Sequence, residues 1–150
     1  MALPTSIELQ IVTPERMLVQ ERVDEVQIPG VAGYFGVLPG HTPLLAALSV
    51  GELWYRQGLE RTYLAIAHGF AEILPDTVTV LAQLAEHADE IDITRAEAAQ
   101  KRATERLARA GEVDYERARL ALVKSLTRLQ VSARIASGAA PRLKRVRREG

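Results

Sequence analysis

The chain of 150 residues fits one ordinary domain or two small ones, which excludes a large multi-domain enzyme. It is 47% hydrophobic and 25% charged and has no cysteine, so we expect a folded globular protein without disulfides, thiolate nucleophiles or cysteine-ligated zinc. The net charge is zero, but the charges are unevenly distributed. Residues 1–92 hold 13 Asp and Glu against 4 Lys and Arg, a net charge of −9, and residues 93–150 hold 6 Asp and Glu against 15 Lys and Arg, a net charge of +9. This division indicates two units with different partners.

Residues 1–88 have the pattern of a β-sandwich domain. Apolar and polar residues alternate with period two in residues 7–11, 25–28 and 77–80, which is typical of strands with one buried face. Turn signals recur at gaps of roughly ten residues, at Pro14, Pro29-Gly30, Pro39-Gly40, Gly51, Gly58, Gly69 and Pro75-Asp76. Short strands at this spacing predict an antiparallel sandwich or barrel rather than a parallel α/β sheet.

Residues 89–138 have the period of helices and predict an antiparallel helical hairpin. The first helix begins either at Asp92 as N-cap or at a capping box of Thr94 and Glu97. Its predicted buried face consists of small and apolar residues, at Ala96, Ala99, Ala103, Leu107 and Ala110. After a glycine turn, Asp114 can cap a second helix that ends at Ser137-Gly138. The predicted apolar face of that helix is formed by Tyr115, Ala118, Leu122, Leu126, Leu129 and Ala133.

The seam between the two helices is predicted to be weak. Alanine dominates the first helix face, and each Ala in place of Leu forgoes roughly 2 kcal/mol of burial. A weakly packed basic hairpin beside an acidic sandwich can therefore adopt a docked and an undocked arrangement. Residues 139–150 carry five bases and almost no core-forming residues, so we expect a disordered basic tail.

Several motifs point to one family. Residues 30–45 read GVAGYFGVLPGHTPLL, and the chain also carries IVTPE at 11–15, HGF at 68–70 and IDITRA at 91–96. Together with the charged, alanine-rich hairpin, these motifs resemble the epsilon subunit of bacterial F-type ATP synthase, over about residues 7–135.

The resemblance implies a fold and a function. The expected fold is a sandwich of about ten antiparallel strands followed by the helical hairpin. The expected function is that of a non-catalytic rotor subunit, with residues 1–88 contacting the gamma subunit and the c-subunit ring of a synthase that makes ATP from a proton gradient. The hairpin would inhibit ATP hydrolysis when extended toward the catalytic alpha and beta subunits. The expected location is peripheral, on the cytoplasmic face of the bacterial inner membrane.

The resemblance also implies two sets of site residues. The loop that would face the c ring and gamma contains Gly33, Tyr34, Phe35 and His41. Its glycines alone are explained by tight turns, and it lacks the Lys-Ser/Thr pair of a phosphate-binding loop. No required cofactor is expected, but some relatives bind regulatory ATP on the hairpin, and the matching positions here are Glu86, Ile91, Asp92, Arg95, Arg102, Lys124 and Arg128.

Alternative interpretations of these residues remain open. The ATP-site residues could equally form a solvated face, with Arg102 pairing to Glu105 or Arg95 to Asp92. The basic second helix and tail could belong to a stand-alone nucleotide- or nucleic-acid-binding module, although no aromatic residue is interleaved among the bases and we expect no nucleic acid. The three histidines show no nucleophile and carboxylate arrangement, so neither a catalytic nor a metal site is predicted.

Overall fold

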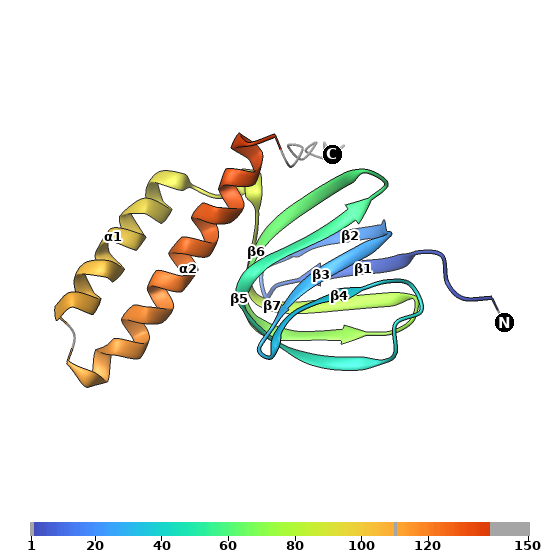
Figure 1. Ribbon diagram of the computed structural model, residues 1–150, viewed down its shortest axis with the longest axis horizontal. Coiled ribbons are helices and arrows are strands. Elements are labelled where there is room, and N and C mark those ends of the chain that lie inside the picture. Colours follow the sequence, from blue (N-terminus) through green and yellow to red (C-terminus); the bar gives the residue numbers. More distant parts are fainter. Residues whose placement is uncertain (1, 110, 139–150) are drawn as a thin grey trace.

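The computed structural model describes residues 2–109 and 111–138, so the predicted tail at 139–150 lies outside the described residues. The strands and helices follow one another in two blocks, a sandwich and then a hairpin (Figure 1). In chain order they are β1 (Ile7–Val12), β2 (Met17–Val23), β3 (Glu25–Gly30), β4 (Gly33–Val37), β5 (Leu44–Gln57), β6 (Glu60–Ile73), β7 (Thr77–His87), the 3₁₀ turn η1 (Ala88–Glu90), α1 (Ile93–Arg109) and α2 (Glu112–Ala136).

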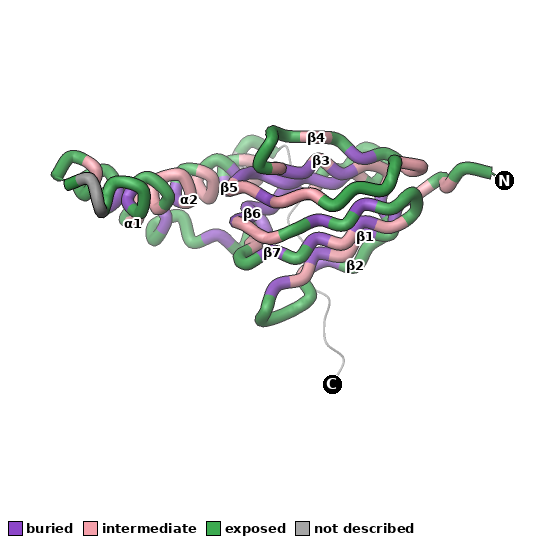
Figure 2. The backbone as a smooth tube through the Cα atoms, turned by 90° about the horizontal axis from the view of Figure 1, so that it is seen from below, coloured by how far each residue is buried: buried purple, intermediate pink, exposed green. Residues whose placement is uncertain are grey.

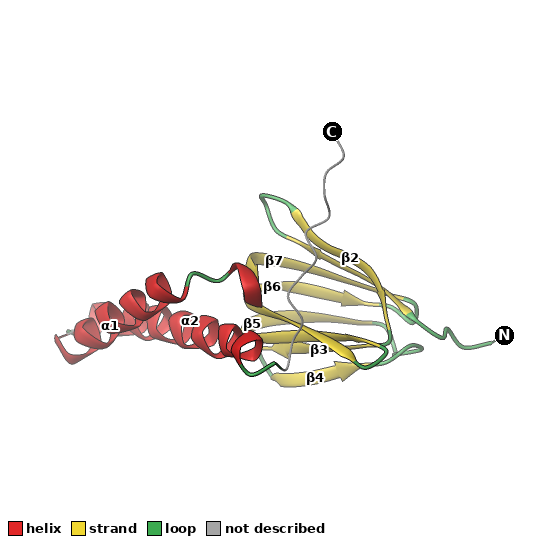
Figure 3. Cartoon of the chain, turned by 90° about the horizontal axis from the view of Figure 1, so that it is seen from above, coloured by secondary structure: helices red, strands yellow, loops and turns green. Residues whose placement is uncertain are grey.

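The described strands form one sheet in the order β2-β1-β7-β6-β5-β3-β4, folded over on itself (Figure 3). This confirms the class of a β-sandwich with a helical hairpin, but the sheet differs from the expectation in two ways. It has seven strands rather than about ten, and β1 and β7 are parallel rather than antiparallel. The count is lower because Gly51 and Gly69, which the sequence predicts as turns, lie inside the 14-residue strands β5 and β6.

The face that β6 buries changes at His68 and Gly69, although its register with β5 and β7 stays the same. Before this point Leu64 and Ile66 face the core, and after it Ala71 and Ile73 do, so the alternation shifts by one residue. His68 and Gly69 both have positive φ, at 59° and 123°. A Cβ at Gly69 would collide with the Leu81 carbonyl oxygen, which explains why glycine is required there.

The core of the sandwich lies between the two halves of the folded sheet (Figure 2). Its largest fully buried side chains are aliphatic, namely Ile7, Leu9, Ile11, Ile28, Leu53, Leu64, Ile66 and Ile73. The predicted strands at 7–11, 25–28 and 77–80 each place their apolar set on this inner face.

Small residues form the seam of the hairpin. On α1, Ala96 and Ala103 are fully buried while Ala99 and Leu107 are half-buried, as the period predicts; Ala110 lies outside the described residues. On α2 the buried residues Ala118, Ser125 and Ser132 recur every seven residues. The predicted apolar face of α2 is therefore partly wrong, because Tyr115, Leu126 and Ala133 are exposed and polar serines take the buried positions.

The ends of the helices resolve the alternatives for capping. Asp92 Oδ1 accepts a hydrogen bond of 3.0 Å from the Arg95 backbone N–H, so Asp92 is the N-cap of α1. α2 begins at Glu112 with Gly111 as its N-cap, so the prediction of Asp114 as the cap is wrong. α2 ends where expected, since Ser137 is its C-cap and Gly138 has a φ of +72°.

Candidate functional site

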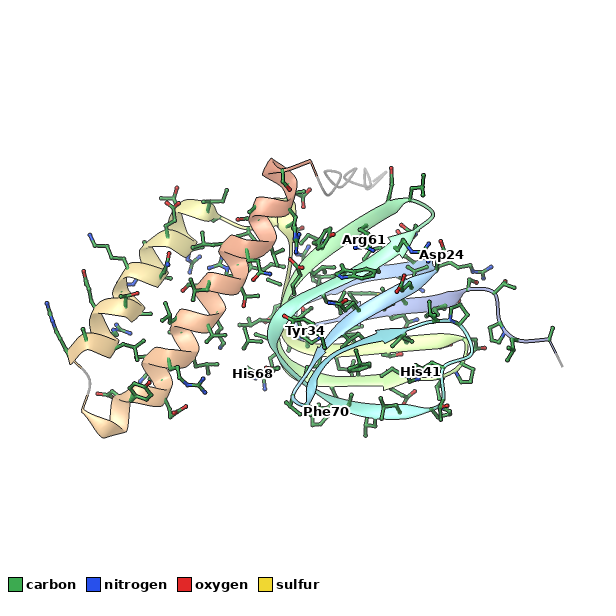
Figure 4. The ribbon with its side chains drawn as sticks, viewed as in Figure 1. Asp24, Tyr34, His41, Arg61, His68 and Phe70 are labelled. Carbon is green, nitrogen blue, oxygen red and sulfur yellow. The ribbon has the colours of Figure 1, made fainter. Side chains whose placement is uncertain are left out.

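The hairpin rests on the sandwich through a second apolar cluster. Trp54, Tyr63 and Ala65 on the outer face of β5 and β6 pack with Ala88, Ile91 and Val131 of the linker and α2. Arg61 lies over the Trp54 ring at 4.1 Å from its centroid, next to this contact (Figure 4). The predicted ATP-site residue Ile91 is therefore part of the packing that joins the two units.

Glu52 and Arg134 form a bidentate ion pair across this contact. Arg134 Nε and Nη2 donate hydrogen bonds of 3.1 and 2.9 Å to the two carboxylate oxygens of Glu52. The Glu52 side chain is only 8% exposed, and the Arg134 guanidinium also lies 4.9 Å from the centre of the Tyr63 ring. The hydrogen bonds that Arg134 donates to Glu52 raise the pKa of Arg134, so this guanidinium stays charged.

Glu86 and Arg128 form a second ion pair between β7 and α2. Arg128 Nη2 donates to Glu86 Oε2 at 3.1 Å, and Arg128 Nε lies 3.0 Å from Glu86 Oε1. Both side chains are partly exposed. Together the two pairs connect the acidic sandwich to the basic hairpin through charges that water and salt can reach.

The linker between the two units has its own ion pair. Arg16 from the β1–β2 loop donates to Glu90 of η1 at 2.7 Å. Partial burial would raise the pKa of Glu90, but the Arg16 hydrogen bond and charge outweigh it and hold that pKa below its usual value. His87, just before η1, is buried, and this burial lowers its pKa although Glu90 lies nearby.

A pocket of about 260 Å³ opens between the hairpin and the sandwich. It brings together three of the predicted ATP-site residues, Glu86, Lys124 and Arg128, beside the small residue Ala99. The rest of its lining is mainly apolar, from Val50, Ala65, Ile66, Ala67 and Leu84. The pocket therefore offers a basic edge and an apolar wall, which suits an amphipathic anion.

The other predicted ATP-site residues lie elsewhere. Asp92 is occupied as the cap of α1, and Arg95 is exposed on that helix. Arg102 lines a different hollow near the turn of the hairpin. No ion pair of Arg102 with Glu105 or of Arg95 with Asp92 occurs within the described part of the chain, so the contacts of the solvated-face alternative do not form either.

The residues predicted to contact the c ring and gamma are spread along β4. Tyr34 is 57% exposed and its hydroxyl accepts a 3.3 Å hydrogen bond from the Glu52 backbone N–H. Phe35 is half-buried against the core, and Gly33 forms the turn with a φ of +126°. His41 follows the far end of β4, so Tyr34 and His41 lie well apart (Figure 4).

An exposed apolar row crosses the outer face of the sheet. Register places Ala47, Phe70, Leu81 and Val12 side by side on β5, β6, β7 and β1. Phe70 and Leu81 are each more than half exposed, and Leu45, two residues before Ala47, is 70% exposed. An exposed apolar patch of this kind is typical of a protein–protein contact.

The sequence did not single out Glu52, which is the sandwich partner of Arg134, or the apolar row. Glu52 is a lone carboxylate inside the apolar run Gly51-Glu52-Leu53-Trp54, and a charge in the middle of a long strand is a signal for a partner. Phe70 could not be recognised as exposed from alternation alone, because the alternation of β6 shifts by one residue at His68 and Gly69.

Among residues 2–109 and 111–138, no group of three His, Asp or Glu side chains is placed to hold a metal ion. The side-chain bonds of His41 and His87 go to the backbone carbonyls of Thr42 and Leu18. None of the described helices combines the length and hydropathy needed to cross a bilayer. The described residues thus define a class of protein in which an acidic β-sandwich holds a basic hairpin through ion pairs.

Comparison with known proteins identifies the family. Residues 6–88 match the ATP synthase delta/epsilon chain β-sandwich domain, and residues 89–133 match the long α-helix domain of the same chain. The chain is 50% identical over 127 residues to the ATP synthase epsilon chain of Syntrophobacter fumaroxidans, which covers 84% of this chain and 95% of that one. It is 51% identical over 106 residues to the epsilon chain of Koribacter versatilis, covering 71% and 75% of the two chains.

The fold is also similar to that of a solved structure. A chain in the cryo-EM structure of the Euglena gracilis mitochondrial ATP synthase matches with a TM-score of 0.77 and 23% identity, over 91% of this chain and 84% of that chain. The chain described above therefore belongs to the ATP synthase delta/epsilon chain family, whose members are non-catalytic subunits of the synthase.

Proposed function

We propose that this chain is a central-stalk rotor subunit of an F-type ATP synthase, which couples the c ring to gamma and regulates ATP hydrolysis through its hairpin. Residues 1–88 would be the rotor-contact unit and residues 89–138 the regulatory unit, at the cytoplasmic face of the bacterial inner membrane. The observation that carries the proposal is the contact between the two units, in which the Glu52–Arg134 and Glu86–Arg128 ion pairs connect the sandwich to the hairpin.

The ion pairs suit a regulatory hairpin. Burying Glu52 without a partner is costly, so Arg134 stabilises the docked state. Glu86 and Arg128 are more exposed, and their attraction is weakened by salt and by competing anions. In the extended state the same arginines would face the acidic surfaces of the catalytic alpha and beta subunits.

The apolar row suits the contact with the rotor. Leu45, Phe70 and Leu81 would bury apolar surface against gamma or the c ring, with Gly33, Tyr34, Phe35 and His41 placed along β4. Substituting Phe70→Asp should prevent assembly with gamma while the isolated chain stays folded, because this side chain is 56% exposed. Leu59→Asp is the matched control, since Leu59 is fully exposed at the β5–β6 turn.

Assembly is measured by detergent extraction of membranes from the native bacterium followed by affinity purification of the tagged chain. The wild-type chain and the Leu59→Asp variant should bring down gamma, the c ring and the catalytic subunits, and the Phe70→Asp variant should not. Recovery of the wild-type chain free of the synthase would overturn the proposal and favour a stand-alone module.

Regulatory ATP would bind in the pocket between the units. Glu86, Lys124 and Arg128 line it, and an ATP phosphate would compete with Glu86 for the Arg128 guanidinium. Ile91, Asp92, Arg95 and Arg102 lie outside the lining, so they would reach the nucleotide only if the hairpin shifts. At about 260 Å³ the pocket is at the small end for ligands, which also requires some opening.

The ATP site is tested by NMR titration of the full chain. Amide resonances of residues 121–128 should shift with millimolar ATP, and Arg128→Gln should weaken binding by about tenfold. Arg119→Gln is the matched control on the same helix, because Arg119 pairs only locally with Glu116. Unchanged helix resonances in the wild-type chain would end the ATP assignment but leave the rotor assignment standing.

A further inference from the structure

The Tyr34 side chain projects from β4 and crosses β3 to reach β5, at the end of the sandwich toward the hairpin (Figure 4). Its hydroxyl oxygen accepts the 3.3 Å hydrogen bond from the Glu52 backbone N–H. A Cβ at Gly51 would lie 2.6 Å from this oxygen and 2.7 Å from the Pro29 Cβ, so the phenol occupies the space that the missing side chain leaves. Tyr34 is thus fixed to β5 from a strand two places away in the sheet.

This contact lies at an interruption in the ladder between β3 and β5. Pairing of the two strands stops after Gln27 and resumes at Gly30, and over this interval two residues of β3 lie opposite five residues of β5. One of the two is Pro29, which has no N–H group. A backbone N–H beside such an interruption needs another acceptor, and the Tyr34 hydroxyl supplies it for Glu52.

The position of the Glu52 backbone decides how its carboxylate meets the hairpin. The Glu52 side chain is almost fully buried, and it accepts both hydrogen bonds from Arg134 of α2. A buried ion pair is favourable only when its geometry is close to ideal, because both charges have lost their water. A small displacement of the backbone at Glu52 is therefore enough to weaken the contact with Arg134.

We propose that Tyr34 is a positioning residue through which the exposed edge of the sandwich controls docking of the hairpin. While the phenol lies over Gly51, the backbone at Glu52 is fixed and its carboxylate meets Arg134. A partner that binds β4 and draws the phenol away removes this support, so the docked hairpin is destabilised. That last step rests on the proposed rotor contact, for which the half-exposed Tyr34 side chain is accessible.

The link between Tyr34 and the hairpin acts in both directions, because a coupling free energy is reciprocal. The Arg134 ion pair holds Glu52 in the position to which the phenol bonds. Arg134→Gln should therefore change the NMR chemical shifts of the Tyr34 ring in the full chain. Arg119→Gln, which removes a charge that pairs only locally, should not change them. Unchanged Tyr34 shifts in Arg134→Gln would contradict the proposal.

A single introduced thiol measures how often the contact opens, because the chain has no cysteine of its own. Val131→Cys places the thiol in the apolar cluster between the two units, where Val131 is fully buried. Val80→Cys makes the same change in the core of the sandwich, where Val80 is equally buried. With an aromatic disulfide reagent in excess, the reaction rate of a buried thiol follows the population of the open state when closing is fast.

The expected result is faster opening of the contact when the Tyr34 hydroxyl is removed. Tyr34→Phe keeps the ring and should speed the reaction at position 131 about fivefold. In the Arg134→Gln background the same change should alter that rate less than about twofold, because the ion pair through which Tyr34 acts is absent. Tyr115→Phe is the matched control, since it removes a hydroxyl from a half-exposed tyrosine of α2 and should leave the rate unchanged.

Three results would overturn the role of Tyr34. A Tyr34→Phe effect seen only at position 80 would show that Tyr34 stabilises the sandwich alone. An equal effect with and without Arg134 would show that Tyr34 does not act through the ion pair. Equal reaction rates at positions 80 and 131 in otherwise unchanged chains would show that the two units open together. All of these measurements use the isolated chain, so their failure is distinct from failure of the rotor assignment, which the affinity purification tests.

Discussion

Individual residues control the shape of the sheet. At Gly51, a Cβ would lie 2.6 Å from the Tyr34 hydroxyl oxygen, so the absent side chain makes room for the Tyr34 side chain, which reaches across β3. At Gly69 the backbone has a φ of +123°, which L-residues rarely adopt. The change of the buried face at this point leaves Phe70 on the surface, within the apolar row proposed to contact the rotor.

Replacing Gly69 with Ala should destabilise the protein by about 2 kcal/mol or more, because the new Cβ meets the Leu81 carbonyl in a strained backbone. Gly36→Ala is the control, since a Cβ there meets nothing within 4 Å. Urea denaturation should show a change within about 0.5 kcal/mol for this control. Equal stability of both variants would show that the backbone tolerates a side chain at position 69 without strain.

The buried His87 should make stability depend on pH. Its folded-state pKa lies below the ordinary value, so the unfolded chain binds the proton first and the free energy of unfolding falls as the pH drops below about 6.5. Glu90, whose pKa is also lowered, contributes only at more acidic pH, as its carboxylate loses the Arg16 pair. Denaturation of the His87→Gln variant between about pH 7 and 5 should show a flatter dependence, whereas His41→Gln should not. If the free energy of unfolding of the His87→Gln variant depended on pH as in the wild-type chain, other titratable groups would be responsible for that dependence.

The hairpin depends on small residues along its seam. Ala96 and Ala103 on α1 and Ala118, Ser125 and Ser132 on α2 let the helices approach closely but bury little apolar area. The serine hydroxyls donate to backbone carbonyls of their own helix, as Ser125 does to Leu122 at 2.8 Å, so they need no partner across the seam. The helices are therefore closely packed and only weakly held.

Enlarging a seam residue should separate the helices. Ala103→Leu should destabilise the hairpin by about 1–3 kcal/mol, because Ala103 is only 2% exposed and the extra volume has no room. Ala98→Leu, at an exposed position of the same helix, is the control. Amide exchange should quicken across α1 and α2 in the first variant, while the sandwich stays protected. A more stable Ala103→Leu variant would show that the seam contains space for larger side chains.

At the scale of the whole molecule, opposite charge and one apolar cluster join the two units. The aliphatic core of the sandwich shares no buried residue with the cluster around Trp54 and Tyr63, which forms the contact itself. The sandwich therefore keeps its core packing if the contact opens, while that cluster is exposed and the ion pairs to Glu52 and Glu86 are lost. Docking is expected to weaken as the salt concentration rises.

Removing Arg134 should release the hairpin. Arg134→Gln leaves the Glu52 carboxylate buried without its partner, which should cost about 2 kcal/mol of docking free energy after allowance for the exposure of Arg134. A double-mutant cycle with Glu52→Gln isolates the pair, since the double variant should recover part of that loss. Amide exchange of residues 126–135 reports docking, with Arg119→Gln as the control. Additive losses in the cycle would show that the pair does not hold the hairpin.

The sequence by itself determined the class of the fold, the change from strand to helix patterns near residue 89, the end of the second helix at Ser137-Gly138, and the family. These features follow from local periodicity, turn chemistry and short motifs, all of which lie within a few neighbouring residues. Charge counting also showed that an acidic unit is joined to a basic one.

Only the tertiary structure decided which of those charges meet. Glu52 and Arg134 are 82 residues apart, and their pairing depends on how α2 lies across β5 and β6. The number of strands and the exposure of Phe70 depend on how β5 and β6 continue past Gly51 and Gly69, which local alternation does not reveal. Arg102 was grouped with Arg95 by helical spacing, but the position of α2 places it in the hollow with Arg117 instead. Contacts between distant segments follow from packing, which no local pattern encodes.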